Sequence, residues 1–307
     1  MDRAPVMRLG IDVGGTKTAA VLLDRRGDVV GQHQVATEHG EAVVDSVLAA
    51  ASVVLRAADV RVDALDGVGL GVPGQVSSDR SSIRNAVHLG LGAFDVGAAV
   101  GARLGAHVLV ENDVKAAVLG ARHLLRADAS ASFAYLGLGT GIAAGVVLDG
   151  AVWRGSSGVA GEIGHVPVPG ATGTCRCGQV GCLETVAAGW ALAERWGEPW
   201  PAARMLAAAS AGDAAAAAQW QGVVDALAHG IRMLTLTVDA RTVAIGGGLR
   251  GLGAPLLDGI RARLAAWAAA SPFLDALAIP SRVHMVPAGS QPAAVGAAIL
   301  GSSAWKS

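Results

Sequence analysis

Two glycine-rich turns, Asp12-Val13-Gly14-Gly15-Thr16-Lys17 and Gly137-Leu138-Gly139-Thr140-Gly141, each interrupt a run of apolar residues. The segments Gly14–Asp24 and Gly139–Asp149 both advance ten residues from a glycine to an aspartate, with an offset of 125. An apolar run, a glycine turn and a second apolar run predict a β-hairpin. The recurrence of this plan at a fixed offset predicts two similar domains, each opened by a hairpin.

Both turns have the composition of a phosphate-binding loop. Successive backbone N–H groups without obstructing side chains form a concave anion site. The first turn adds the carboxylate of Asp12, the hydroxyl of Thr16 and the ammonium of Lys17, and a strand follows it instead of the helix of a P-loop. Asp12 lies between apolar neighbours and needs a charged partner, for which we predict Mg²⁺ beside a nucleotide. The alternatives are turns that bind nothing and a solvated Lys17.

All three cysteines of the chain lie within eight positions, as Cys175, Cys177 and Cys182, and His165 precedes the first of them by ten residues. One imidazole and three thiolates form the ligand set of a closed, tetrahedral Zn²⁺ site. The odd number of cysteines is unfavourable for a disulfide framework. Three reduced thiols on a buried loop are the other alternative.

Two carboxylates bracket the predicted zinc loop. Glu162 precedes His165 by three residues, and Glu184 follows Cys182 by two. Zinc occupies one ring nitrogen of a histidine and leaves the other N–H free to donate. One donor and two carboxylate acceptors would suit a ligand rich in hydroxyl groups.

Composition excludes several classes of function. The chain has 307 residues, and its 24 Lys and Arg against 25 Asp and Glu give no basic excess for nucleic acid. This length allows two domains. Ala129–Leu148 carries no charge over twenty residues, so a membrane-spanning helix is an alternative there. The glycines at its centre and the lack of flanking basic clusters favour the hairpin, and we expect a cytoplasmic protein with no membrane partner.

Further elements follow from periodicity and from turn residues. Expected strands are 67–72, 106–110, 242–245 and 283–286, and expected helices are 41–57, 114–125, 187–221, 221–236 and 292–300. Pro73-Gly74 closes the first of these strands, and Glu111-Asn112-Asp113 follows the second. Ligands collect at the carboxyl ends of strands in open α/β sheets. A helix N-cap is the simpler explanation for Asn112 or Asp113.

The motif Glu162-x-Gly164-His165, followed by Cys175-x-Cys177-Gly178-x-x-Gly181-Cys182-x-Glu184, resembles the signature of the ROK family of sugar kinases and sugar-responsive repressors. Asp12-x-Gly14-Gly15-Thr16-Lys17 is similar to the phosphate loop of the wider hexokinase and actin-like ATPase superfamily. The resemblance runs from Asp12 to Ala298. It implies an α/β fold with two RNase H-like domains and an interdomain cleft. The smaller domain would comprise residues 1–113 and 291–307, and the larger residues 114–290 with the zinc loop.

The resemblance also implies roles for individual residues. Asp113 would be the catalytic base, and the sugar would be held by Gly74, Asn85, Asn112, Asp113, Glu162, His165 and Glu184. ATP and Mg²⁺ would lie against Asp12, Gly14, Gly15, Thr16, Lys17, Gly139, Thr140 and Gly141, with Gly247 and Gly248 near the adenosine. Structural Zn²⁺ would be bound by His165, Cys175, Cys177 and Cys182. A homodimer or a homotetramer is expected.

One segment departs from the family pattern. Glucokinase-like members follow the Pro-Gly turn with an Asn-Leu motif and then a tryptophan near the sugar, whereas here Arg84-Asn85-Ala86-Val87-His88-Leu89 follows and no tryptophan precedes Asp113. We expect a hexose, glucose first, as substrate. The alternatives are an N-acetylhexosamine, a carbocyclic sugar analogue, or a non-catalytic, sugar-sensing protein. A repressor would need a helix-turn-helix segment ahead of Asp12, which only eleven residues precede.

Overall fold

The computed structural model describes residues 6–197 and 201–302, and the chain groups into two compact units. The first unit comprises Met1–Arg126, Ala151–Val159 and Gly289–Ser307, and the second comprises Ala127–Gly150 and Ala160–Ala288. The predicted α/β class with two RNase H-like halves is confirmed. The helix that begins at Asp113 groups with the first unit.

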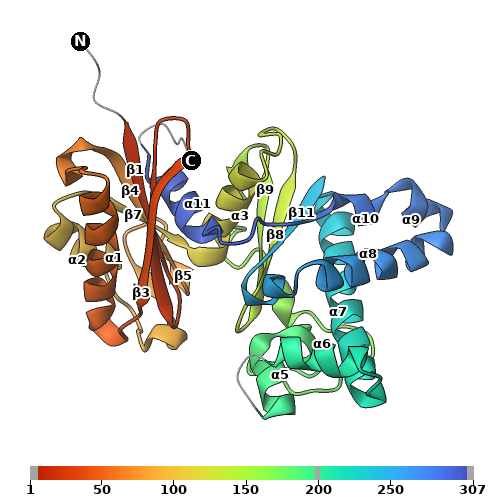
Figure 1. Ribbon diagram of the computed structural model, residues 1–307. Helices are drawn as coiled ribbons and strands as arrows, with labels where there is room; N and C mark the ends of the chain where they lie inside the picture. Colours follow the sequence, from red (N-terminus) through yellow and green to blue (C-terminus); the bar gives the residue numbers. More distant parts are fainter. Residues whose placement is uncertain (1–5, 198–200, 303–307) are drawn as a thin grey trace. The chain divides into compact units, whose positions relative to one another are not determined.

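The first unit is built on a five-stranded sheet (Figure 1). Its strands, in spatial order, are β3 (Val29–Ala36), β2 (Lys17–Leu23), β1 (Met7–Val13), β4 (Leu65–Val72) and β7 (Val108–Asn112). β3, β2 and β1 are antiparallel, and β1, β4 and β7 run parallel. β3 was not predicted because it is an edge strand of exposed and half-buried residues, which gives little apolar signal.

The second unit repeats this sheet. Its sheet has, in spatial order, β10 (Ala151–Val152), β9 (Ile142–Leu148), β8 (Phe133–Leu138), β11 (Thr242–Gly246) and β12 (Val283–Met285). The residues of the short edge strand β10 group with the first unit, and the other four strands belong to the second. β9 and β8 are antiparallel, and β8, β11 and β12 run parallel. This is the order and direction of β2, β1, β4 and β7, so the predicted duplication is confirmed.

The uncharged segment Ala129–Leu148 contains the β8–β9 hairpin, and the membrane-helix alternative is therefore wrong. None of the helices within residues 6–197 and 201–302 is both long enough and apolar enough to cross a membrane. The strands of the hairpin are almost wholly buried, which explains a continuous apolar run without period-two alternation.

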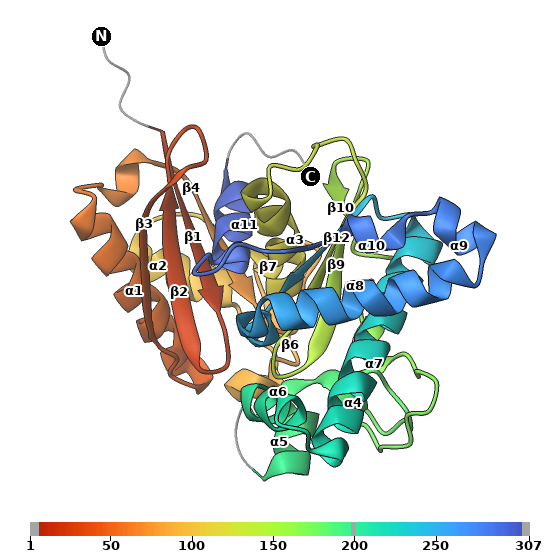
Figure 2. The same cartoon turned by 45° about the vertical axis from the view of Figure 1, so that its right-hand side comes forward.

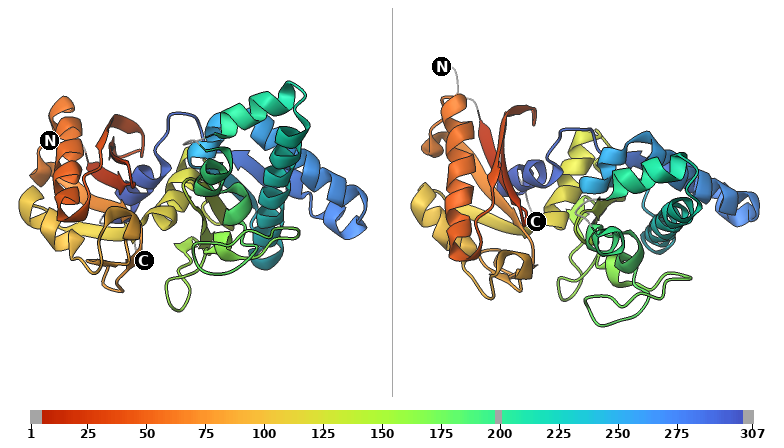
Figure 3. Two further views of the ribbon diagram at one scale, coloured as in Figure 1. Left: turned by 90° about the horizontal axis from the view of Figure 1, so that it is seen from below. Right: turned by 60° about the horizontal axis from the view of Figure 1, so that its bottom comes forward.

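Helices cover both faces of the first sheet (Figure 3). They are α1 (Val43–Ala57), α2 (Val96–Leu104), α3 (Asp113–Leu124) and α11 (Pro292–Gly301). α1 confirms the helix expected over 41–57, and its apolar side chains pack against the sheet: Val43, Val44, Val47, Leu48, Ala51, Val54 and Leu55. After β4 the chain forms a small hairpin of β5 (Gln75–Val76) and β6 (Ile83–Arg84).

α11 packs at backbone distance against the sheet and against α3, although almost the whole chain separates it from β1 (Figure 1). A Cβ on Gly10 would overlap the carbonyl oxygen of Ala294, and one on Gly69 would overlap that of Ala297. Gly120 of α3 faces Pro292 of α11 in the same way. The small-residue composition of α11 therefore serves close packing.

Gly120→Ala is expected to destabilise the protein by about 1 to 3 kcal/mol, because the new methyl group overlaps Pro292 and the two helices must separate. Gly222→Ala is the matched control. Gly222 also lies inside a helix but has open space around its Cβ position, so alanine there should stabilise by roughly 0.5 to 1 kcal/mol through helix propensity. Urea unfolding of both variants tests this contrast, and equal shifts would contradict it.

The helices of the second unit are α4 (Glu184–Ala187), α5 (Gly189–Trp196), α6 (Ala202–Ser210), α7 (Ala214–Val238), α8 (Ala254–Ala269), α9 (Pro272–Ala276) and α10 (Ile279–Arg282). α7 and α8 pack against each other (Figure 2), and their apolar side chains join those of the sheet in one core.

The predicted helix boundaries in this region are wrong. The helical stretch 187–221 is divided between shorter helices, with residues 198–200 outside the described part, and α7 runs through Gln221 without a break. Its true start is the N-cap Asp213, whose carboxylate accepts from the N–H groups of Ala215 and Ala216. Alanine favours a helix at every position of this stretch, so the ends of the helices are marked only by capping residues and turn glycines.

Candidate functional site

In the first unit, Asp12 lies at the carboxyl end of β1 and Asp113 directly follows β7, and β4 lies between these two parallel strands. Asp12 is opposite Gly71 of β4, which in turn is opposite Glu111 of β7. A Cβ on Gly71 would lie 3.7 Å from the Cα of Asp113, so only a glycine in β4 separates the two acids at this edge. The fold thus brings together two carboxylates that are a hundred positions apart in the chain.

Burial, and secondly the negative charge of Asp113, raise the pKa of Asp12 from its ordinary value of 3.8 to about 8. An acid in this environment holds a proton at neutral pH unless a cation compensates its charge. A cation such as Mg²⁺ would supply that charge, since carboxylate oxygens are the ligands it prefers. The residues therefore fit the predicted magnesium role.

Because the pKa of Asp12 is raised, the free energy of unfolding should fall as the pH rises, in the absence of Mg²⁺ and nucleotide. Between about pH 4 and pH 8 the unfolded chain has lost this proton while the folded chain keeps it, so the free energy of the unfolded state falls relative to that of the folded state as pH rises. Asp12→Asn removes the effect. Urea unfolding should show the variant gaining stability over the wild type from pH 5 to pH 8 and little further change above pH 8, whereas a constant gap would contradict the assignment.

The first turn connects β1 and β2 tightly. The N–H of Gly14 donates to the carbonyl oxygen of Lys17 at 2.9 Å, and His39 Nε2 lies 3.0 Å from the carbonyl oxygen of Gly15. Thr16 and Lys17 are exposed at the tip. Their hydroxyl and ammonium groups are therefore accessible to a phosphate.

Asn112 joins the turn after β4 to the start of α3. Its Oδ1 accepts from the N–H groups of Val114 and Lys115, both at 3.1 Å, and its Nδ2 donates to the carbonyl oxygen of Gly74 at 3.2 Å. The N-cap explanation is thus correct for the side-chain oxygen. One Nδ2 hydrogen is used by Gly74, and the predicted contact with a sugar would need the other.

Asn85 lies in the segment that contacts Gly74. A Cβ on Gly74 would lie 2.7 Å from the carbonyl oxygen of Arg84, so β6 and the Pro-Gly turn touch. Asn85 is exposed, with a left-handed φ of 58°, and its N–H donates to Gly92 at 3.1 Å. The predicted sugar-binding residues Gly74, Asn85 and Asn112 are therefore neighbours in one unit.

In the second unit, the glycine hairpin and the Gly247 loop lie together. The N–H of Gly139 donates to Gly141 at 3.0 Å, and Leu138 pairs with Ile142, so this turn is one residue tighter than the first. Gly247, with φ of 80°, packs on the backbone of Leu138 so closely that a Cβ would overlap it. Two predicted nucleotide loops thus share one edge of the second sheet.

The four predicted zinc ligands converge. The Nδ1 of His165 and the Sγ atoms of Cys175, Cys177 and Cys182 all lie within 4.8 Å of one another, with 3.6 Å between His165 and Cys175. Cys177 and Cys182 are separated by 3.8 Å, which is the edge of a tetrahedron with Zn–S bonds of about 2.3 Å. Ligand type and spacing fit Zn²⁺.

The thiols differ in their readiness to ionise. N–H donation from Gln179 lowers the pKa of Cys177 to about 6, whereas burial raises the pKa of Cys182 to about 12. A bound Zn²⁺ would stabilise both as thiolates. The Nδ1 of His165 faces Cys175, and its Nε2 lies 4.0 Å from the carboxylate of Glu162.

Glu184 holds the glycine hairpin of its own unit. Its Oε1 accepts from the N–H of Ile142 at 2.6 Å, and its Oε2 accepts from Trp190 Nε1 at 3.1 Å. The start of α5 adds hydrogen bonds from Gly189 to Gly139 and from Trp190 to Thr140. The carboxylate expected to contact sugar therefore also links the zinc loop to the predicted phosphate turn.

Several residues of this site were not predicted. Glu111 accepts from Arg154, Lys115 donates to Gly158, and Trp190 contacts Glu184. Among these residues, only Glu111 could have been found from the sequence, because it is an acid at the end of an apolar strand, as Asp12 is. The other partners lie far away in the sequence and show no local pattern.

Residues 8–303 match the ROK family. The chain is 29% identical over 282 residues to a glucokinase of Halalkalibacterium halodurans, which covers 85% of this chain and 86% of that protein. It is 29% identical to an N-acetylmannosamine kinase of Haemophilus influenzae, over 78% of this chain and 79% of the other.

A solved structure agrees with these sequence matches. A ROK family glucokinase from Streptomyces griseus, in complex with glucose and AMPPNP, superimposes with a TM-score of 0.78 at 28% identity, covering 96% of this chain and 99% of the other. The family match extends over nearly the whole chain and includes both glycine turns and the His-Cys₃ cluster. This chain belongs to the ROK family.

Proposed function

We propose that this ROK sugar kinase transfers the γ-phosphoryl group of ATP to a hydroxyl group of a hexose, with glucose as the preferred acceptor. The pairing of Asp12 with Asp113 carries the proposal. One acid at the end of β1 suits a cation beside the phosphates, and the other at the start of α3 suits proton removal. Similarity to glucokinases, one of them bound to glucose and an ATP analogue, supports the acceptor.

In the proposed reaction, Asp113 accepts the proton of the attacking hydroxyl as the oxygen–phosphorus bond forms and the bond from the γ-phosphorus to the ADP oxygen breaks. Phosphoryl transfer is loose, so positioning and charge neutralisation supply most of the acceleration. Mg²⁺ held near Asp12 would neutralise phosphate charge. Lys17 and the two glycine turns would hold the phosphate oxygens, with the adenosine near Gly247 and Gly248.

Acceptor binding is assigned to the residues around the two acids and to the zinc loop. The residues that would meet hydroxyl groups of the acceptor are Asn85, Asn112, Glu162, His165 and Glu184. His165 is suited to donate through Nε2, because its Nδ1 faces the cysteines. Zn²⁺ would fix this loop without an open coordination position.

The segment after β6 supports a second acceptor class. Val87 of this segment is 79% exposed, and no tryptophan lies between Asn85 and Asp113, where the family pattern has one, so we expect a less bulky wall here. An N-acetylhexosamine carries an extra group that needs such space, and similarity to an N-acetylmannosamine kinase points the same way. A carbocyclic analogue is the other alternative.

An ATP-consumption screen over aldohexoses, N-acetylhexosamines and cyclitols tests the proposal, with Asp113→Asn protein as the blank for contaminating kinases. Glucose should give the highest kcat/KM. Faster turnover of an N-acetylhexosamine or a cyclitol would move the assignment to that class. No turnover above the blank with any acceptor would favour a sugar-binding protein without catalysis.

A further inference from the structure

Residues Ala151–Val159 are here called the crossing segment. They group with the first unit, whereas Gly150 before them and Ala160 after them belong to the second unit. Glu162 follows its end by three residues and His165 by six. The crossing segment therefore leads directly into this part of the predicted sugar site.

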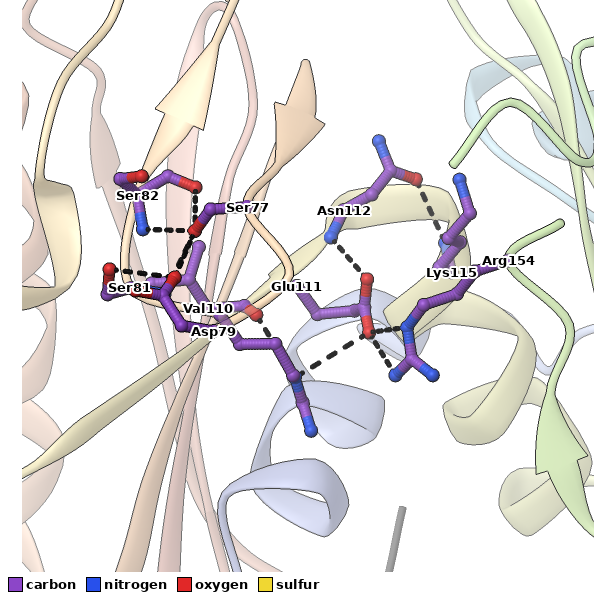
Figure 4. Close-up of polar contacts among 10 residues, drawn as sticks. Ser77, Asp79, Ser81, Ser82, Val110, Glu111, Asn112, Lys115 and Arg154 are labelled. Atoms are coloured by element: carbon purple, nitrogen blue, oxygen red, sulfur yellow. Dashed lines mark hydrogen bonds and ion pairs between the residues drawn. The ribbon is translucent and has the colours of Figure 1, made fainter. Parts of the chain in front are cut away.

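Two polar contacts fix the crossing segment within the first unit. Arg154 donates through Nε and Nη2 to Glu111 Oε2, at 2.9 and 2.5 Å (Figure 4). Lys115 Nζ donates to the carbonyl oxygen of Gly158 at 2.8 Å. Both N–H groups of the guanidinium converge on one carboxylate oxygen, and charge-assisted hydrogen bonds of this kind are stronger than neutral ones.

Burial makes both contacts hard to replace. The side chain of Glu111 is 3% exposed, and Lys115 is buried as well. A buried charge whose partner is removed is strongly unfavourable, so each partner constrains the other. Arg80 Nε, 3.9 Å from Glu111 Oε2, approaches the same carboxylate, which therefore lies near two guanidinium groups.

The same residues flank the Asn112–Asp113 turn. Glu111 immediately precedes it and accepts the N–H of Asn112 through Oε1 at 3.0 Å (Figure 4). Lys115 lies two residues after Asp113, and its own N–H is capped by Asn112. One oxygen of Glu111 thus holds the turn, and the other holds the crossing segment.

We infer that Glu111, Arg154 and Lys115 are positioning residues, which fix the crossing segment to the turn that carries the base. Resting on the proposed kinase function, this means that the contacts hold both the turn that carries Asp113 and the segment that leads into the acceptor residues Glu162 and His165. None of the three needs to touch a substrate. Their loss should therefore affect the acceptor hydroxyl and leave ATP binding nearly unchanged.

Arg154→Met and Lys115→Met test the inference, because each keeps an apolar stem and removes the charged contact. Each should lower kcat by roughly ten- to a hundredfold and raise the acceptor KM, with the ATP KM within about twofold, since small misplacements cost this much. Glu111→Gln combined with Arg154→Met should be little worse than either alone, because both remove one contact. Arg103→Met is the control, at an exposed ion pair with Asp45 in the same unit.

Hydrogen exchange supplies a readout that needs no turnover. Arg154→Met should speed exchange of peptides covering 108–116 and 154–166 together, and Arg103→Met should not. Lower thermal stability with unchanged kcat, acceptor KM and exchange in these peptides would overturn the inference. If the wild type phosphorylates no acceptor, the proposed function fails, and the exchange result still decides whether these contacts hold the segment.

Discussion

Asp113→Asn is expected to lower kcat by about 10² to 10⁴ while leaving the fold and the ATP KM almost unchanged, because general-base assistance is worth this much. The amide keeps the shape of the side chain and can still accept the N–H of Val114, which Asp113 Oδ1 accepts at 2.9 Å. Loss of rate would therefore reflect loss of the proton acceptor. Steady-state kinetics with the best acceptor of the screen measure the effect.

Asp95→Asn is the matched control. Asp95 begins α2 in the same unit and accepts from the N–H of Ala98, so the same chemical change is made at a helix N-terminus. Asparagine caps helices as well as aspartate does, and neither rate nor stability should change beyond small effects. Near wild-type turnover by the Asp113 variant would exclude it as the base.

Loss of zinc is expected to have the largest effect on stability. Cys175→Ser removes a buried ligand and should reduce bound zinc from one per chain to none. Metal binding to such sites is linked to folding, and we expect a fall in Tm on the order of 10 °C or more. Elemental analysis and thermal unfolding measure the two outcomes, and treatment of the wild type with a chelator should reproduce both.

Kinetics should show that the zinc loop supports both substrates. Glu184 follows Cys182 by two residues and holds Ile142, so a loosened loop should raise the KM for ATP as well as for the acceptor. Arg176→Ala is the control, since Arg176 lies between two ligands, forms an exposed ion pair with Glu194 and covers the ring of the half-buried Trp190 from outside the cysteine cluster. Fully active wild-type protein without zinc would refute the assignment.

Local sequence was sufficient for several features whose parts lie close together in the chain. The hairpins at Gly14 and Gly139 depend on a turn and its two flanking strands, and the zinc ligands from His165 to Cys182 lie within one loop. The apolar period of α1 was equally clear. Each of these features needs particular residue types at short spacings along the chain, and such a pattern can be recognised in the sequence itself.

Local sequence was insufficient where composition is uniform or where the signal is weak. The alanine-rich stretch around α6 and α7 has helix propensity throughout, so the true N-cap at Asp213 was missed. β3 lies at a sheet edge with polar side chains and gave no apolar run. Boundaries depend on single caps, which a propensity average does not detect.

The tertiary structure alone placed distant groups in contact. Parallel pairing of β1, β4 and β7 puts Asp12 beside Asp113, and burial followed by the charge of Asp113 raises the pKa of Asp12, which the residues around Asp12 could not specify. Packing of α4 and α5 gives Glu184 a backbone N–H of the β8–β9 hairpin, and the crossing segment brings Arg154 to Glu111. Such contacts join residues more than forty positions apart, and their geometry follows from sheet register and chain path, which no local pattern encodes.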